Sequence, residues 1–147
     1  MEWFSEDRET LTMLSQERIF RAFLRILGSV SLLALVFVAA PYAWMDAIHR
    51  WLGMGKLPEE PVVGYLARST SAFYAMFGGL LWLASFDLKR YRPVLAYLGV
   101  TTVALGLALG VIDWLEGMPP FWKVAEGPLD AALGIAIVWV ALRVDPQ

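Results

Sequence analysis

Four long apolar stretches, separated by short segments that carry most of the charges, constrain this chain more than any other feature. They cover residues 26–44, 65–86, 93–115 and 124–142. Each has about the 20 residues that an α-helix needs to cross the hydrocarbon core of a bilayer. Because unpaired backbone groups are costly in lipid, single segments of this length must cross as helices. The pattern predicts an all-α fold, a bundle of four transmembrane helices.

The composition agrees with this prediction and excludes several kinds of site. The chain is 59% hydrophobic and 18% charged, whereas soluble domains are about 45–50% apolar and about 25% charged. It has no cysteine and one histidine, His49, which excludes thiolate chemistry and a multi-histidine metal site within one chain. The net charge of -2 and the lack of a basic patch argue against nucleic acid as a partner.

Residues 1–25 differ from the rest because charged and apolar residues alternate there at helical spacing. Ser5 is a good N-cap, and Glu6 and Asp7 follow it where the helix dipole favours negative charge. This predicts an amphipathic helix at the membrane surface, either separate from the first span or continuous with it. The alternative is a frayed polar tail. The chain therefore divides into an interfacial segment, residues 1–25, and a transmembrane domain, residues 26–147.

The distribution of basic residues predicts the orientation. With the N-terminus inside, eight of the 12 Lys and Arg residues lie on the cytoplasmic side and the other four outside. Both termini are therefore expected in the cytoplasm. The longest outer connection, residues 45–64, carries a short segment at 45–52 that suits an interfacial helix before Gly53 and Gly55 interrupt it.

Three of the expected spans carry a face of small or polar residues, which lets another helix approach closely. Packing within the bundle is the commoner use of such a face, and homodimerisation through the spacing of Gly106 and Gly110 is the alternative. The faces comprise Arg68, Ala72, Ala75 and Gly79; Gly99, Thr102, Gly106, Gly110 and Asp113; and Glu126, Asp130, Gly134 and Ile137.

Charged residues gather near the outer ends of spans two to four, where ionisable groups are expensive unless they turn inward or find partners. Glu126 and Asp130 are four residues apart and share a helix face, so a cation or a proton is needed there. Arg68 is expected to pair first with Glu126 and next with Asp113. Three interpretations stay open: a structural ion network, a ligand pocket, and a proton or redox site. The candidate residues are Arg68, Asp113, Glu116, Glu126 and Asp130.

Several motifs resemble a family of small bacterial four-helix membrane proteins of unknown function that is similar in layout to DoxX-like proteins. They are the stretch from Arg68 to Gly79, the basic turn at 89–93, the segment 113–119, and Glu126. The resemblance covers about residues 26–142. It implies a bacterial inner-membrane location and an association with quinone or respiratory enzymes. The family often has a polar or basic residue where this chain has Gly110, and it lacks the charged N-terminal segment.

The sequence contains no nucleophile–base pair, phosphate-binding loop or metal motif, so no catalytic or metal-binding residue is predicted. The leading hypothesis is a non-catalytic accessory or structural subunit that binds lipid and other membrane proteins. The first alternative is a protein that binds a quinone or lipid in the outer half of the bundle, near Arg68 and Glu126. The second alternative, from the enzyme class, is a DoxX-like redox accessory.

Overall fold

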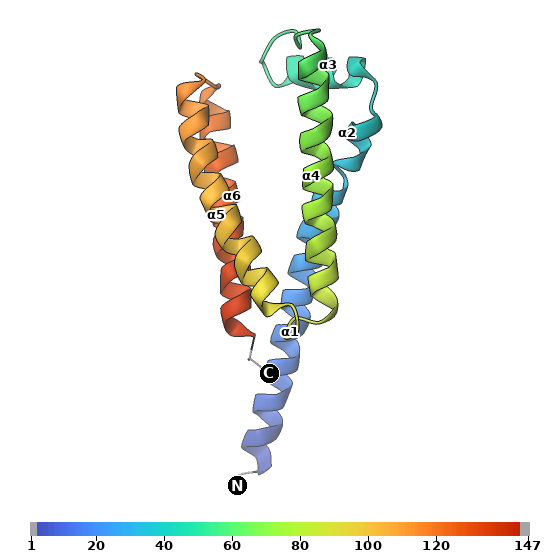
Figure 1. Ribbon diagram of the computed structural model, residues 1–147. Helices are drawn as coiled ribbons and strands as arrows, with labels where there is room; N and C mark the ends of the chain where they lie inside the picture. Colours follow the sequence, from blue (N-terminus) through green and yellow to red (C-terminus); the bar gives the residue numbers. More distant parts are fainter. Residues whose placement is uncertain (1–2, 145–147) are drawn as a thin grey trace. The chain divides into compact units, whose positions relative to one another are not determined.

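The computed structural model describes the backbone of residues 3–144 and the side chains of residues 15–144. Within this part the regular secondary structure is all helix, with no strand (Figure 1), which confirms the all-α prediction. The helices are α1 (Trp3–Leu32), α2 (Leu35–Ala39), α3 (Tyr42–Trp51), α4 (Pro61–Phe86), α5 (Arg92–Leu115) and α6 (Pro120–Arg143).

Three helical segments of the described chain are long and apolar enough to cross a membrane, as expected of an integral membrane protein. They are Ser15–Ala39, Arg92–Leu115 and Pro120–Arg143. Helix α4 corresponds to the predicted second span and is 26 residues long. Its first half includes the polar run from Arg68 to Ser71, and α4 is not among the three candidate spans. The predicted bundle of four spans therefore stays a prediction.

The first predicted span, residues 26–44, is not one continuous helix, which corrects the sequence-based expectation. A turn at Leu33 and Ala34 separates α1 from α2, and Pro41 separates α2 from α3. Proline disfavours the helical conformation in the residue before it, and Ala40 has a ψ of 140°. Residues 42–44 therefore belong to α3, the short helix expected at 45–52.

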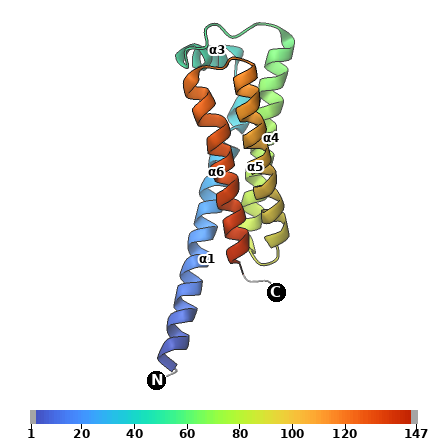
Figure 2. The same cartoon turned by 90° about the vertical axis from the view of Figure 1, so that its left-hand side faces the viewer.

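The N-terminal segment is helical from Trp3 and runs without a break into the first span. Among the possibilities given for the N-terminal segment, the continuous helix is the one observed for residues 3–25 (Figures 1 and 2). Its C-terminal turns are packed: Phe20 and Leu24 are buried, and the Phe20 ring meets the edge of Trp139 on α6 at 5.3 Å between centroids. This part of α1 is therefore integrated with the membrane helices.

The chain forms two compact units. One comprises residues Ile26–Trp82, and the other comprises Met1–Arg25 with Leu83–Gln147. In the first unit, a Cβ on Gly28 would lie 2.8 Å from the Gly78 carbonyl oxygen. Ser29 accepts a hydrogen bond from Trp82 Nε1, and Arg68 reaches Val38. Residues further along the first span contact residues earlier in α4, so the two helices run antiparallel. Gly78, rather than Gly79, makes the close contact.

In the second unit, α5 and α6 lie side by side as an antiparallel hairpin (Figures 1 and 2). A Cβ on Gly99 would lie 2.9 Å from the Gly134 carbonyl oxygen, and one on Gly127 would lie 2.7 Å from that of Gly106. Only residues without a side chain allow two helix backbones to approach so closely. The face predicted on the third span therefore packs through Gly99 and Gly106. On the fourth span, Gly134 of the predicted face packs together with Gly127, which was not part of that face. This does not test homodimerisation.

Candidate functional site

The turn between α5 and α6 brings charged and aromatic residues together at one end of the hairpin. Gly117 adopts a φ of 69°, which favours glycine. The Met118 N–H donates a hydrogen bond of 3.0 Å to the Asp113 carbonyl oxygen, which closes the end of α5. Pro120 then begins α6, a position where the missing N–H is not needed. The first turns of α6 are thereby placed beside the last turns of α5.

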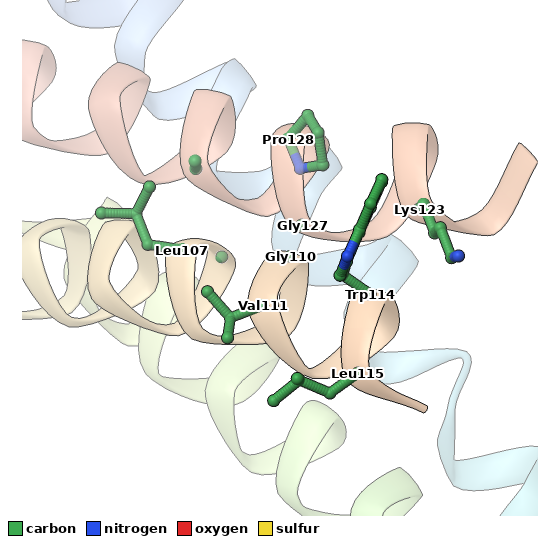
Figure 3. Close-up of a pocket in the computed structure, with 10 residues that line it drawn as sticks. Leu107, Gly110, Val111, Trp114, Leu115, Lys123, Gly127 and Pro128 are labelled. Carbon is green, nitrogen blue, oxygen red and sulfur yellow. The ribbon is translucent and has the colours of Figure 1, made fainter. Parts of the chain in front are cut away.

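A largely apolar groove of about 580 Å³ lies between the two helices at this end (Figure 3). Three glycines line its floor: Gly106 and Gly127, which are packed against the facing helix, and Gly110. A Cβ added at Gly110 would meet no atom within 4 Å, so the space beside this residue is open. The remaining lining is Leu107, Val111, Trp114, Leu115, Lys123, Pro128 and Ala131.

Lys123 and Trp114 stand at the end of the groove nearest the turn (Figure 3). The Lys123 ammonium lies 5.0 Å from the centroid of the Trp114 ring, within the range of a cation–π interaction. Lys123 is the one charged residue in the described lining of the groove. The groove thus has an apolar body and a positively charged end.

Another face of α6 carries carboxyl groups. The indole Nε1 of Trp122 donates a hydrogen bond to Glu126 Oε2. Glu126 and Asp130 both line a shallow recess of about 330 Å³, which confirms that they share a helix face. Phe121 and Trp122 supply the aromatic part of this recess, with their ring centroids 6.1 Å apart.

Asp113 is the most deeply buried carboxylate of the predicted cluster, with 3% of its surface exposed. It lies close enough to Glu126 for the two carboxyl groups to interact. Within the described part of the chain, Asp113 Oδ2 accepts no hydrogen bond. An uncompensated charge at a buried position is costly, so two carboxyl groups this close need a compensating partner. Asp113 thus lies near Glu126, and Glu126 shares a recess with Asp130; the site predicted from these residues stays a prediction.

The other two predicted site residues are described by their own surroundings. Glu116 is exposed at the C-cap of α5. Arg68 belongs to the unit of residues 26–82, where its guanidinium donates hydrogen bonds of 2.6 Å to the Val38 carbonyl oxygen and 3.0 Å to that of Ala40. Backbone carbonyls are thus the partners observed for Arg68. Its predicted pairing with Glu126, a residue of the other unit, stays a prediction.

The loop after α3 is organised by a second polar cluster. Asp46 accepts hydrogen bonds from Arg50 Nε at 3.0 Å and from the Leu57 backbone N–H at 2.8 Å. These two donors, Arg50 first, hold the pKa of Asp46 below its ordinary value of 3.8. His49 Nδ1 lies 2.9 Å from the Gly55 carbonyl oxygen. These contacts give both side chains a role in holding the loop.

Sequence reasoning missed the groove and the role of Lys123 in it. Gly110 was expected only to pack against another helix, within the bundle or in a homodimer. The available signal was a lysine four residues before Gly127 on α6, facing a tryptophan four residues beyond Gly110 on α5. No group of three or more His, Cys, Asp or Glu in the described residues is arranged to hold a metal ion.

Comparison with known proteins leaves the site without a relative. No family model, curated protein or solved structure matches the chain. The resemblance to DoxX-like proteins therefore stays a prediction, and the function must be argued from the contacts alone.

Proposed function

We propose that this chain is a non-catalytic integral membrane protein with four spans, which serves as an accessory subunit of a larger membrane complex through its N-terminal helix. The observation that carries this proposal is the continuity of α1. A single helix begins at Trp3 and is still helical at Leu32, whereas the stretch without charged residues begins only at Ile26. Residues 3–14 therefore form a helical arm ahead of the span.

The direction of the arm favours a protein partner over lipid. A helix that lies in the interface must turn where it joins a spanning helix, and α1 has no break in this region. The arm thus leaves the membrane along the path of the first span. Its sequence mixes Glu6, Asp7, Arg8 and Glu9 with Leu11, Met13 and Leu14. Apolar side chains held outside the bilayer gain stability when another protein covers them.

The antiparallel packing in the unit of residues 26–82 supports α4 as the fourth span. Its contacts run from Arg68 beside Val38 to Trp82 beside Ser29. Val38 and Ser29 both lie inside the candidate span Ser15–Ala39. A helix that accompanies a membrane span over this length lies at the same depth in the bilayer. Arg68 is tolerated there because its hydrogen bonds are satisfied by backbone carbonyls.

The proposal is tested by removing residues 2–14, so that Met1 precedes Ser15, and by measuring the size of the complex extracted from native membranes with a mild detergent. The full chain is expected to migrate with a partner, and the shortened chain at its own size. The control carries Lys56→Ala and Glu59→Ala, which remove an exposed ion pair in the loop after α3 and should leave the complex intact. A shortened chain that keeps the complex would overturn the proposal.

A cross-linking measurement identifies the contact more directly. A photoreactive residue at Thr10 is expected to capture one protein in stoichiometric amount, whereas the same residue at Glu59 is not. Purification through that captured protein should return this chain.

The groove between α5 and α6 favours a second candidate function, the binding of an amphipathic ligand such as a lipid or a quinone.

A further inference from the structure

We propose that the groove between α5 and α6 binds one anionic phospholipid, with the phosphate at Lys123 and an acyl chain along the glycine floor. The shape of the groove carries the first step of the argument. It extends along α6 from Lys123 to Ala131, a rise of about 12 Å over eight residue steps. Apart from Lys123, its described lining presents apolar side chains and glycine. This suits a hydrocarbon chain.

The position of the charge carries the second step. Lys123 lies in the first turn of α6, and Trp114 lies next to the end of α5. Both therefore sit where the hairpin meets the polar edge of the bilayer, the depth of lipid phosphates and of interfacial tryptophans. The positive end of the α6 dipole points the same way. A negatively charged headgroup at this end meets the charge of Lys123, while its tail meets the apolar body.

The open space beside Gly110 carries the third step. A Cβ at Gly99, Gly106, Gly127 or Gly134 would come within 3 Å of the facing helix, whereas one at Gly110 would meet nothing within 4 Å. A side chain at Gly110 would therefore not disturb the packing of α5 against α6. Its effect is to leave the groove wide where an acyl chain would pass.

The test measures retention of lipid by the purified full chain after exchange into detergent, by native mass spectrometry. The probes are phosphatidylglycerol and phosphatidylcholine with identical acyl chains. Phosphatidylglycerol should be preferred, and Lys123→Gln should reduce that preference about fivefold, the effect of about 1 kcal/mol for one lysine near a membrane surface. Gly110→Leu should reduce the retention of both lipids, because leucine occupies the acyl path.

Two controls make the result specific. Gly79→Leu places the same side chain at an exposed glycine of α4 that also has no atom within 4 Å of its Cβ position, and Lys56→Gln removes an exposed lysine elsewhere. Neither should alter retention. Equal retention of the two phospholipids, preferential retention of a neutral quinone, or indifference to both groove variants would overturn the proposal. The measurement needs no partner protein, so its failure is distinct from a failure of the N-terminal arm to dock.

Discussion

The guanidinium of Arg68 binds the backbone carbonyl oxygen of Val38, with 2.6 Å between Nη1 and O. Its second terminal nitrogen binds the Ala40 carbonyl oxygen. These carbonyls lie at the end of α2, where Pro41 interrupts the helix and leaves acceptors without an intrahelical donor. One arginine of α4 thus completes the hydrogen bonding of a break in the first span.

Replacing Arg68 by methionine should therefore destabilise the unit of residues 26–82. Two hydrogen bonds from a charged donor are lost, and two carbonyls are left without this donor in an apolar setting, so we expect a loss of roughly 2–4 kcal/mol. Arg68→Lys, which keeps the charge but not the fork, should fall in between. Thermal unfolding in detergent measures the effect. Arg90→Met, at an exposed position, serves as the control, and equal melting of Arg68→Met and Arg90→Met would contradict the prediction.

The sequence placed Arg68 on a small and polar face of a helix at membrane depth, but it pointed to Glu126 as the partner. Charge complementarity can be read from residue types, whereas a backbone carbonyl has no signature in the sequence. The acceptors arise because α2 ends before Pro41, and the hydropathy of the stretch does not show which carbonyls such a break leaves free. The helical segments themselves were predictable because hydropathy and length determine them.

The glycine faces likewise combine a feature that the sequence predicts with one that it does not. Spacing of three and four residues correctly predicted that Gly99 and Gly106 share a packed face. It did not separate Gly106 from Gly110, nor Gly78 from Gly79, because adjacent positions and successive turns differ only in where a Cβ would point. That direction depends on the crossing geometry of two helices, and the sequence of one helix does not contain it.

Gly106→Ala should destabilise the α5–α6 hairpin, whereas Gly110→Ala should be nearly neutral, although the two glycines form one motif. A Cβ at Gly106 would collide with the backbone of Gly127 and Ala131, and a Cβ at Gly110 would meet open space. Overpacking typically costs about 1–3 kcal/mol. Unfolding of both variants in detergent, monitored by circular dichroism, gives the comparison. Similar losses of stability in the two variants would mean that α5 packs in a different register.

The contact between Asp46 and the Leu57 N–H should respond to acid. The pKa of Asp46 is lowered below 3.8 in the folded loop, first by the hydrogen bond from Arg50 and then by that from Leu57. A lowered folded-state pKa contributes stability that is present above 3.8 and is lost as the pH falls through the folded value. The Leu57 amide resonance in NMR should therefore titrate with a midpoint below 3.8.

Asp46→Asn should abolish that titration while keeping an acceptor for the Leu57 N–H. Glu59→Gln, which removes the exposed partner of Lys56, should leave it in place. A midpoint at or above 3.8 in the unmodified chain would show that the loop does not hold the ionised form of Asp46.

The number of spans can be decided by labelling, because the chain has no cysteine of its own. Single cysteines are placed at Ser5, Lys56 and Lys89 and exposed to an impermeant thiol reagent from outside intact cells. Four spans with cytoplasmic termini predict labelling at Lys56 alone. The physical reason is that α4 carries the chain across the bilayer between Lys56 and Lys89, antiparallel to the first span, with Arg68 satisfied by carbonyls on the way.

Each other pattern has a defined meaning. If only the three most apolar segments cross, α4 does not cross the bilayer. Lys56 and Lys89 then lie on the same side and must label alike. Labelling at Ser5 and Lys89 without Lys56 would keep four spans but reverse the orientation expected from the eight-to-four distribution of basic residues. Labelling after permeabilisation confirms that each cysteine is reachable. Restriction of labelling to Lys56 therefore requires both that α4 spans the membrane and that the N-terminal arm lies in the cytoplasm, where its partner must be sought.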